Sequence, residues 1–200
     1  MKSAESKRWI RSWPTNCKNM QGKKNHYNVQ VITMTALMAA IIFVVTYIIR
    51  IPLPFASGGY LNIGDTPIYI GAFLLGGPAG AIAAALGSAL ADLAAGYVFY
   101  AAPTAIIKGL MGLVAGVLLT RSKTFYRFLF ASIIGGAIMV VGYALFEAFF
   151  FNLNQAIVTI PFNAIQWGGG VVVAMALYPA VNRIKHAVPA LDREPQIKTK

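Results

Sequence analysis

Six apolar runs, bounded by Pro, Gly or charged residues, constrain the fold of this chain more than any other feature of its sequence. A helix needs about 20 predominantly apolar residues to cross the hydrocarbon core of a bilayer. Only 12% of the 200 residues are charged, against about 25% in typical soluble domains. The sequence therefore predicts an all-α integral membrane protein, a six-helix transmembrane bundle. The runs cover residues 29–49, 66–77, 78–97, 103–121, 127–151 and 156–182.

Two of these runs have informative boundaries. The first follows a basic segment of 28 residues and shows no small-residue cleavage pattern. Its length suits a spanning helix better than the apolar core of a signal peptide, which has about 7–15 residues. The second and third runs are separated only by Gly76, Gly77 and Pro78. We therefore expect the second helix to be short or tilted and to form a tight hairpin with the third.

The basic residues are distributed unevenly along the chain. Seven Lys and Arg precede residue 28, three lie within 121–127 and five follow residue 182, whereas Arg50 is alone in the remaining loops. Cytoplasmic loops carry an excess of Lys and Arg, so both termini are expected in the cytoplasm, which requires an even number of spans. The expected organisation is a basic N-terminal tail (1–28), a six-helix membrane domain (29–182) and a cytoplasmic C-terminal tail (183–200).

The net charge of +11 does not indicate a nucleic-acid partner. A nucleic-acid binder gathers its basic residues on one exposed surface, whereas most of them here lie in two tails that flank apolar helices. The lipid bilayer is the partner that this pattern predicts.

Motifs for catalysis and for cofactor binding are missing from the sequence. No Gly-rich segment ends in Gly-Lys-Ser or Gly-Lys-Thr, so the chain has no P-loop for ATP. Both histidines, His26 and His186, and the single cysteine, Cys17, lie in the predicted tails. No zinc motif, iron–sulfur motif, catalytic triad or carboxylate pair is present. We expect no enzymatic activity, no metal and no cofactor.

Three ionisable residues, Asp92, Lys108 and Glu147, interrupt the predicted spans. On insertion scales each costs about 2.5–3.5 kcal/mol at the centre of a membrane helix, and such residues mark a functional interior or a satisfied pair. With a rise of about 1.5 Å per residue, all three lie in the outer third of the membrane domain.

Further polar residues are predicted at the same depth. Asn163, Gln166 and Trp167 share one face of the last helix because they are spaced i, i+3, i+4. Asn62 and Asp65 approach from the first outer loop. The inner half of the bundle is almost purely Ala, Gly, Leu, Ile and Val. The pattern thus indicates a cup open to the outside and not a continuous pore, which needs polar groups at successive depths.

Several of these features have a purely structural alternative. Lys108 either lines a ligand site or forms an ion pair with Glu147 or Asp92. Asp65 precedes Thr-Pro, a pattern typical of a helix start in which Asp or Thr is the N-cap and Pro lies in the first turn. The outer loop at 50–65 is either a lid over the cup or a simple connection. Small residues at four-residue spacing, such as Gly112 with Gly116, indicate close helix packing within the bundle.

Four short motifs are specific enough to compare with known families. They are Asn62-Ile-Gly-Asp-Thr-Pro, Leu75-Gly-Gly-Pro-Ala-Gly80, Ala91-Asp92 through Gly96, and Pro103-Thr104-Ala-Ile-Ile-Lys108-Gly109-Leu-Met-Gly112. Together they resemble the substrate-binding S components of energy-coupling factor (ECF) vitamin transporters, of the riboflavin and hydroxymethylpyrimidine type. The resemblance runs from about residue 30 to 182. Ala36 and Ala40 are similar to the alanine motif with which this family docks on its coupling subunit.

The resemblance implies a vitamin site near the outer face, formed by the first loop and the last three helices. It also implies a bacterial-type plasma membrane, a membrane coupling subunit and two ABC-type ATPases as partners. We therefore expect the chain to capture a small water-soluble vitamin or precursor, similar to hydroxymethylpyrimidine or pyridoxine, or riboflavin. The expected substrate-binding residues are Asn62, Asp92, Lys108, Glu147, Asn163, Gln166 and Trp167, and the expected docking residues are Ala36 and Ala40.

Two other functions stay open at this level. In an autonomous proton-coupled secondary carrier or channel, Asp92, Lys108 and Glu147 would relay protons. In a membrane assembly factor, the same residues would only hold helices together.

Overall fold

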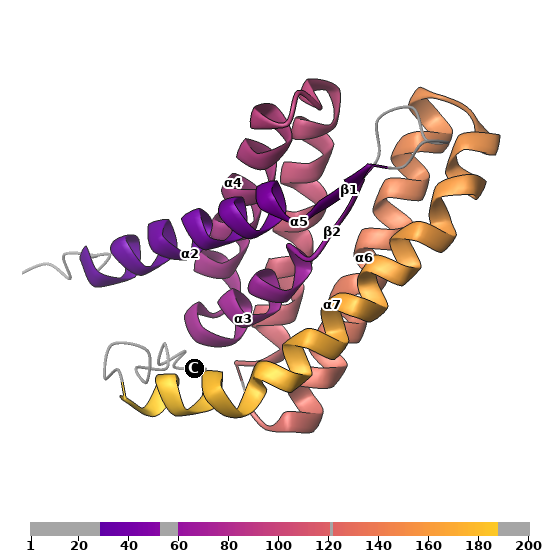
Figure 1. Cartoon of the computed structure of the whole chain (residues 1–200). Helices are drawn as coiled ribbons and strands as arrows, with labels where there is room; N and C mark the ends of the chain where they lie inside the picture. Colours follow the sequence, from indigo (N-terminus) through magenta and orange to yellow (C-terminus); the bar gives the residue numbers. More distant parts are fainter. Residues whose placement is uncertain (1–28, 53–59, 121, 188–200) are drawn as a thin grey trace, which may run out of the picture.

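A computed structural model describes residues 29–52, 60–120 and 122–187. The predicted N-terminal tail, 1–28, lies outside the described residues. Within them the chain forms six helices and one pair of short strands (Figure 1), so the helical class and the number of helices are as predicted. In chain order the elements are α2 (Val29–Ile48), β1 (Arg50–Pro52), β2 (Tyr60–Asn62), α3 (Asp65–Leu75), α4 (Gly77–Ala94), α5 (Val98–Leu118), α6 (Phe125–Phe150) and α7 (Leu153–Ala187).

Five of these helices are long and apolar enough to cross a membrane, and α3 is the shorter apolar one. At about 1.5 Å per residue, the 11 residues of α3 extend over roughly half of a hydrocarbon core about 30 Å thick. Gly76 adopts a positive φ of 79° directly after α3, and α4 begins at Gly77 with Pro78 in its first turn. This is the tight connection that the sequence predicted.

The strand pair was not predicted, because the sequence between α2 and α3 was interpreted as an irregular loop. β1 and β2 are antiparallel, with Arg50 opposite Asn62 and Pro52 opposite Tyr60. Pro52 lies at the end of its strand, where the missing N–H does not interrupt the ladder. In Figure 1 the pair rises from the end of α2, and β2 then leads down to α3.

Two helices extend beyond their predicted limits. α5 begins at Val98 and contains Pro103, which was expected to start the helix. Near a helix start, a proline removes only one intrahelical hydrogen bond. α7 begins at Leu153 and continues to Ala187, past the expected limit at residue 182, and contains Pro161 and Pro179.

Small residues allow the helices to approach closely, as their spacing predicted. A Cβ atom added to Gly112 of α5 would lie 2.9 Å from the Gly80 carbonyl oxygen of α4, and one added to Gly87 would lie 2.5 Å from the Ala39 carbonyl oxygen of α2. Without a hydrophobic drive between helices in lipid, close backbone approach is the main source of packing energy. These glycines therefore set the spacing between α2, α4 and α5.

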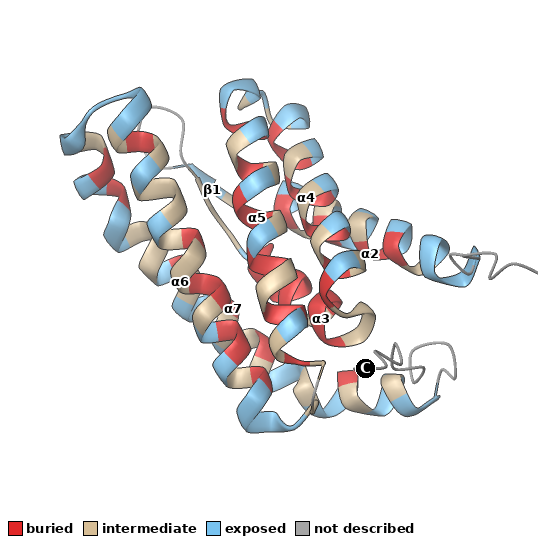
Figure 2. Cartoon of the chain, turned by 180° about the vertical axis from the view of Figure 1, so that it is seen from behind, coloured by how far each residue is buried: buried red, intermediate tan, exposed pale blue. Residues whose placement is uncertain are grey.

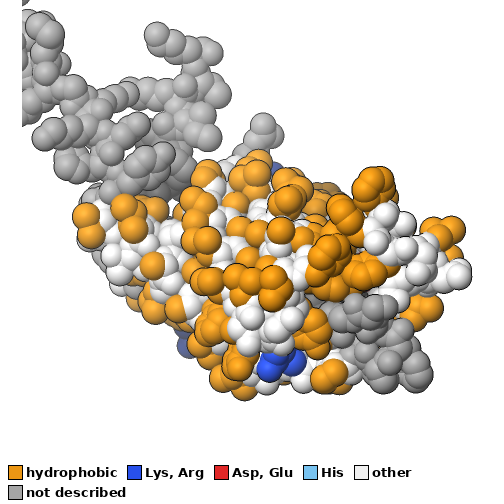
Figure 3. All heavy atoms as spheres, turned by 90° about the horizontal axis from the view of Figure 1, so that it is seen from above, with side chains coloured by type: hydrophobic (Ala, Val, Ile, Leu, Met, Phe, Trp, Pro, Cys, Tyr) orange, Lys and Arg blue, Asp and Glu red, His pale blue; other side chains and the backbone are white. Residues whose placement is uncertain are grey.

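Burial follows the arrangement of the helices. α3 is packed against α2, α4, α5 and α7, and most of its residues are buried, whereas the outward faces of α2, α6 and α7 are exposed (Figure 2). The side chains on those faces are mainly apolar, and in Figure 3 hydrophobic side chains are spread over the visible face with Lys and Arg at few points. An exterior of this kind suits contact with lipid.

A polar cavity beneath the strand pair as candidate functional site

One cavity in the described part of the chain gathers most of the buried polar side chains. Its free volume is about 50 Å³, counted as room for the centre of a water molecule. It lies between α4, α5, α6 and α7, and β2 contributes to its wall. The lining residues are Thr46, Tyr60, Asn62, Gly64, Ser88, Asp92, Tyr100, Thr104, Lys108, Tyr143, Glu147, Thr159, Asn163 and Gln166.

Six of the seven predicted substrate-binding residues line this cavity, namely Asn62, Asp92, Lys108, Glu147, Asn163 and Gln166. The seventh, Trp167, is not among the lining residues. Its ring packs against Gly136 of α6 and the apolar core, so it does not have the place at the cavity that the sequence suggested. Trp167 follows Gln166 directly, and successive side chains of a helix point about 100° apart around its axis, so the two face different surroundings.

The polar residues that the prediction missed follow a simple pattern. On α5, the missed residues Tyr100 and Thr104 precede the predicted Lys108 at four-residue spacing. All three line the cavity. Ser88 and Asp92 of α4 have the same spacing. Residues four apart share one helix face. A search for Ser, Thr and Tyr at four-residue spacing from the ionisable residues would therefore have found these side chains.

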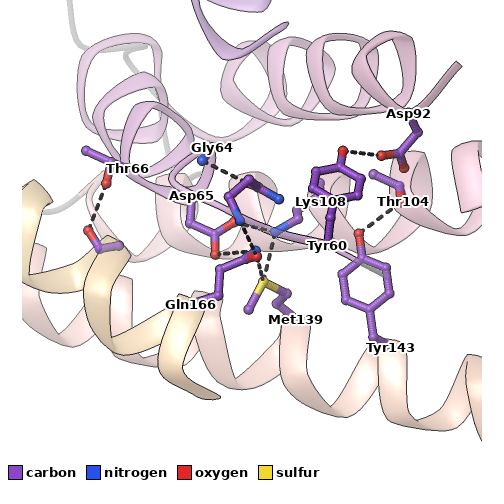
Figure 4. A network of polar contacts seen from close by, with 12 residues as sticks. Tyr60, Gly64, Asp65, Thr66, Asp92, Thr104, Lys108, Met139, Tyr143 and Gln166 are labelled. Atoms are coloured by element: carbon purple, nitrogen blue, oxygen red, sulfur yellow. Dashed lines mark hydrogen bonds and ion pairs between the residues drawn. The ribbon is translucent and has the colours of Figure 1, made fainter. Parts of the chain in front are cut away.

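Lys108 forms its ion pair with Asp65, not with Glu147 or Asp92 as the sequence suggested. Figure 4 shows the two side chains meeting between α3 and α5. The Lys108 ammonium also contacts the Met139 sulfur at 2.8 Å, and Gln166 Nε2 donates to the second Asp65 oxygen at 3.1 Å. Both charges are almost fully buried, with 3% exposure for Lys108 and none for Asp65. The pair thus joins α3, α5 and α7 below the cavity.

Asp65 was also expected as a candidate helix cap, and the structure gives it another role. The residue before α3 is Gly64, which has no side chain that could cap the helix. Asp65 is the first helical residue. Thr66 of the same turn donates its hydroxyl to the Gly170 carbonyl of α7 at 3.1 Å. Helix α3 is held by these interhelical contacts, because its first side chains point into the bundle.

Asp92 accepts a hydrogen bond from the Tyr60 hydroxyl of β2. Burial raises the pKa of Tyr60 well above its ordinary value, and the nearby Asp92 carboxyl raises it further. The phenol therefore keeps its proton at ordinary pH and acts as the donor. Asn62 of the same strand donates its backbone N–H to Gln166 Oε1 at 3.0 Å. These two bonds fasten β2 to α4 and α7 over the cavity (Figure 4).

Glu147 has only hydroxyl partners. Tyr100 donates to Oε1 at 3.3 Å, and the Thr159 hydroxyl donates to Oε2. Glu147 is 3% exposed and Asp92 4% exposed, and neither forms a salt bridge within the described residues. The two carboxylates thus differ from Asp65, which has Lys108 beside it.

The two predicted docking residues, Ala36 and Ala40, lie on the exposed side of α2. The buried positions of this helix are Thr35, Met38, Ile42 and Thr46, so the alanines face away from the bundle. The described residues contain no group of three or more His, Cys, Asp or Glu that could hold a metal ion.

A comparison with protein families matches residues 26–183 to the ECF-type riboflavin transporter S component. The match covers most of the chain, including α2 to α6 in full and α7 as far as residue 183. The chain belongs to this family. It is therefore a multi-pass membrane protein and the substrate-binding S component of an ECF-type transporter, as the sequence motifs indicated. The family is one of transporter components that work with ECF partners.

Two curated relatives are similar to the chain over most of their own length. The chain is 32% identical over 156 residues to the "Thiamine precursor transporter HmpT" of Lactococcus lactis subsp. cremoris, a match that covers 78% of the chain and 90% of the relative. It is 35% identical over 134 residues to a Pyrococcus woesei protein called "Uncharacterized protein in gap 3'region", with 67% of the chain and 89% of that protein covered.

Solved structures share the fold. The S component for biotin from an ECF-type ABC transporter superposes with a TM-score of 0.63 at 19% identity, over 81% of this chain and 94% of its own. A structure described as the S component of a bacterial ECF transporter gives a TM-score of 0.66 at 21% identity, over 78% and 97% of the two chains. At this level of identity the likeness concerns the fold.

Proposed function

We propose that this S component captures a thiamine precursor, with hydroxymethylpyrimidine as the first candidate. The observation that carries the proposal is the polar cavity, in which carboxylate, amide and hydroxyl groups converge from α4, α5, α6, α7 and β2. Such a site suits a small, polar heteroaromatic ligand. The similarity to the thiamine precursor transporter of Lactococcus lactis, along 90% of that protein, supports the same choice.

Riboflavin is the second candidate, because the matching family model carries that vitamin in its description. The polar groups of the cavity converge from several helices onto one site, which suits a compact ring with polar substituents better than a ligand with a long polyol chain.

The ligand would enter from the outer side, with both termini in the cytoplasm. α3 would be the second crossing despite its length, with the strand pair at its outer end, since β2 leads down to α3 (Figure 1). The number of crossings thus stays even although α3 is short. The start of α6, which carries Arg127, and the end of α7, which carries Arg183, lie at the opposite end from the strand pair (Figure 1). This supports a cytoplasmic location for that end.

Delivery inward would require the partners that the family resemblance implied, a membrane coupling subunit and two ABC-type ATPases. The exposed Ala36 and Ala40 are our candidates for the contact with the coupling subunit, because small side chains let a second helix approach closely. This arrangement, and not a proton relay through Asp92 and Glu147, would supply the energy for uptake.

The test is direct binding to the purified full chain in detergent, measured by isothermal titration calorimetry. The probes are 4-amino-5-hydroxymethyl-2-methylpyrimidine, the thiazole precursor of thiamine, riboflavin and biotin. Tight binding of the pyrimidine and weak binding of the other three is the expected result. Tight binding of riboflavin or biotin, with no binding of either thiamine precursor, would overturn the proposed substrate.

A further inference from the structure

The positive charge at the cavity already has a partner of opposite charge, whereas two of the negative charges have none within the described residues. The Lys108 ammonium is neutralised by Asp65 and held by the Met139 sulfur at 2.8 Å. Gln166 is equally committed, since it donates to Asp65 at 3.1 Å and accepts the Asn62 backbone N–H at 3.0 Å. These groups form the base of the cavity and already use their main hydrogen-bonding directions.

Asp92 and Glu147 have acceptor capacity to spare. An ionised carboxylate can accept about four hydrogen bonds. Glu147 accepts one hydroxyl on each oxygen, from Tyr100 and Thr159. Asp92 accepts the Tyr60 hydroxyl and also has the Thr104 hydroxyl beside it. Within the described residues no cation pairs with either carboxylate. Both line the cavity, so their remaining acceptor positions are available to a ligand.

A buried carboxylate without a cation is costly, and the cost falls when a ligand supplies positive charge or N–H donors. The same groups repel a ligand that brings negative charge into the cavity. Asn163 also lines the cavity, and its side chain makes no hydrogen bond to another described residue, so it can serve a ligand as donor and acceptor together.

We propose that Asp92 and Glu147 determine the specificity of this S component by accepting N–H hydrogen bonds from the ligand. The site then takes a heteroaromatic ring with an amino group beside a ring nitrogen, neutral or protonated, and rejects carboxylates and phosphates. This inference rests on the proposed function, and it selects the aminopyrimidine from among the precursors of thiamine.

The test compares ligands that differ in one group on the wild-type full chain. The probes are 4-amino-5-hydroxymethyl-2-methylpyrimidine, its analogue with hydrogen in place of the amino group, its 4-oxo analogue and its phosphate ester. Loss of a hydrogen bond to a charged acceptor costs about tenfold to one hundredfold in affinity. We expect the amino compound to bind at least about tenfold more tightly than each of the other three.

Two variants locate the effect. Asp92→Asn and Glu147→Gln keep the size of each side chain but remove its charge and one acceptor oxygen. In the variant responsible for recognition, the preference for the amino compound over the 4-hydrogen analogue is expected to fall about tenfold. Asn154→Ala, at an exposed position at the start of α7, is the control and keeps the preference.

The outcomes separate the inference from the function on which it rests. Equal binding of the amino and 4-hydrogen pyrimidines to the wild type overturns the inference and leaves the proposed function in place. A preference that persists in both variants also overturns it. If no pyrimidine binds, the proposed substrate fails and the inference fails with it. The ligand comparison needs only the wild type, so a variant that does not fold leaves the test intact.

Discussion

At the scale of single residues, the side chains at the cavity fall into two groups with different roles. Lys108, Asp65 and Gln166 bind one another and join three helices. Asp92 and Glu147 have hydroxyl partners and open acceptor positions. Substitutions in the first group should therefore affect stability first, and substitutions in the second group should affect ligand binding first.

Lys108→Met is expected to destabilise the protein strongly. It leaves Asp65 fully buried without its cation, and breaking a buried ion pair in this way costs about 3–5 kcal/mol. The double variant Lys108→Met, Asp65→Asn should recover part of the loss, because no uncompensated charge remains. The midpoint of thermal unfolding in detergent measures the difference.

Arg127→Met is the matched control for this experiment, since Arg127 is exposed in α6. Its midpoint should stay near the wild-type value. A double variant that is no more stable than Lys108→Met alone would show that the ion pair is not what holds Asp65 in place.

At the scale of elements, the strand pair depends on the helices below it. β2 is three residues long, too short to be stable alone. The Tyr60 hydroxyl and the Asn62 backbone fix it to Asp92 and Gln166, and the Tyr60 ring lies against the Tyr97 ring with centroids 4.9 Å apart. The cover of the cavity is thus fastened by two hydrogen bonds and one aromatic contact.

Tyr60→Phe is expected to weaken ligand binding. The variant keeps the ring contact but removes the donor to Asp92, which loosens β2, and one such bond is worth about 0.5–1.5 kcal/mol, or roughly threefold to tenfold in affinity. Calorimetric titration with the bound vitamin or precursor measures the change.

Tyr97→Phe serves as the comparison, because it also keeps its ring, and the Tyr97 hydroxyl makes no hydrogen bond to another residue in the described part of the chain. It should bind as the wild type does. Equal affinities for Tyr60→Phe and wild type would mean that the hydrogen bond to Asp92 does not hold the cover.

Gly116→Ala is expected to disrupt the packing of α4 on α5. The added Cβ would meet the backbone of Gly77 and lie 2.6 Å from the Gly76 carbonyl carbon, where only a shift of the helices makes room. Overpacking of this kind typically costs about 1–3 kcal/mol. A lower thermal midpoint, with less folded protein recovered by size-exclusion chromatography, is the expected result.

Gly168→Ala provides the matched substitution, since nothing lies within 4 Å of its added Cβ in α7. Alanine is the better helix former, so this variant should be at least as stable as the wild type. A similar loss of stability in both variants would contradict the assignment of Gly116 to close helix packing.

At the scale of the whole molecule, we propose that the basic residues set the orientation in the membrane, with both termini in the cytoplasm. Cys17 is the only cysteine of the chain and lies in the basic N-terminal segment. A membrane-impermeant maleimide added to intact cells should therefore leave the wild-type chain unlabelled, and label it after the membrane is permeabilised.

The opposite side is tested with Asn154→Cys in a Cys17→Ser background. Asn154 is exposed at the turn between α6 and α7, which we expect on the outer side. This variant should be labelled in intact cells. Labelling of Cys17 from outside, with protection of the cysteine at 154, would reverse the proposed orientation.

The sequence alone determined the helices, because a bilayer offers no water to unpaired backbone groups and each apolar run must satisfy its own hydrogen bonds. It also placed Asp92, Lys108 and Glu147 at one depth, since depth follows from the helical rise. The family motifs in the sequence indicated the class of transporter. These properties depend on which residues follow one another along the chain, and this order is read directly from one sequence.

The tertiary structure alone decided which polar groups meet. Lys108 pairs with Asp65, 43 residues away, because α3 is short and begins at the level of the cavity. The rotation of α7 turns Gln166 toward this pair and Trp167 into the core. The strands pair only because α2 and α3 bring Arg50 opposite Asn62. Partner choice depends on how helices cross and rotate, and those angles are fixed by packing among segments far apart in the sequence.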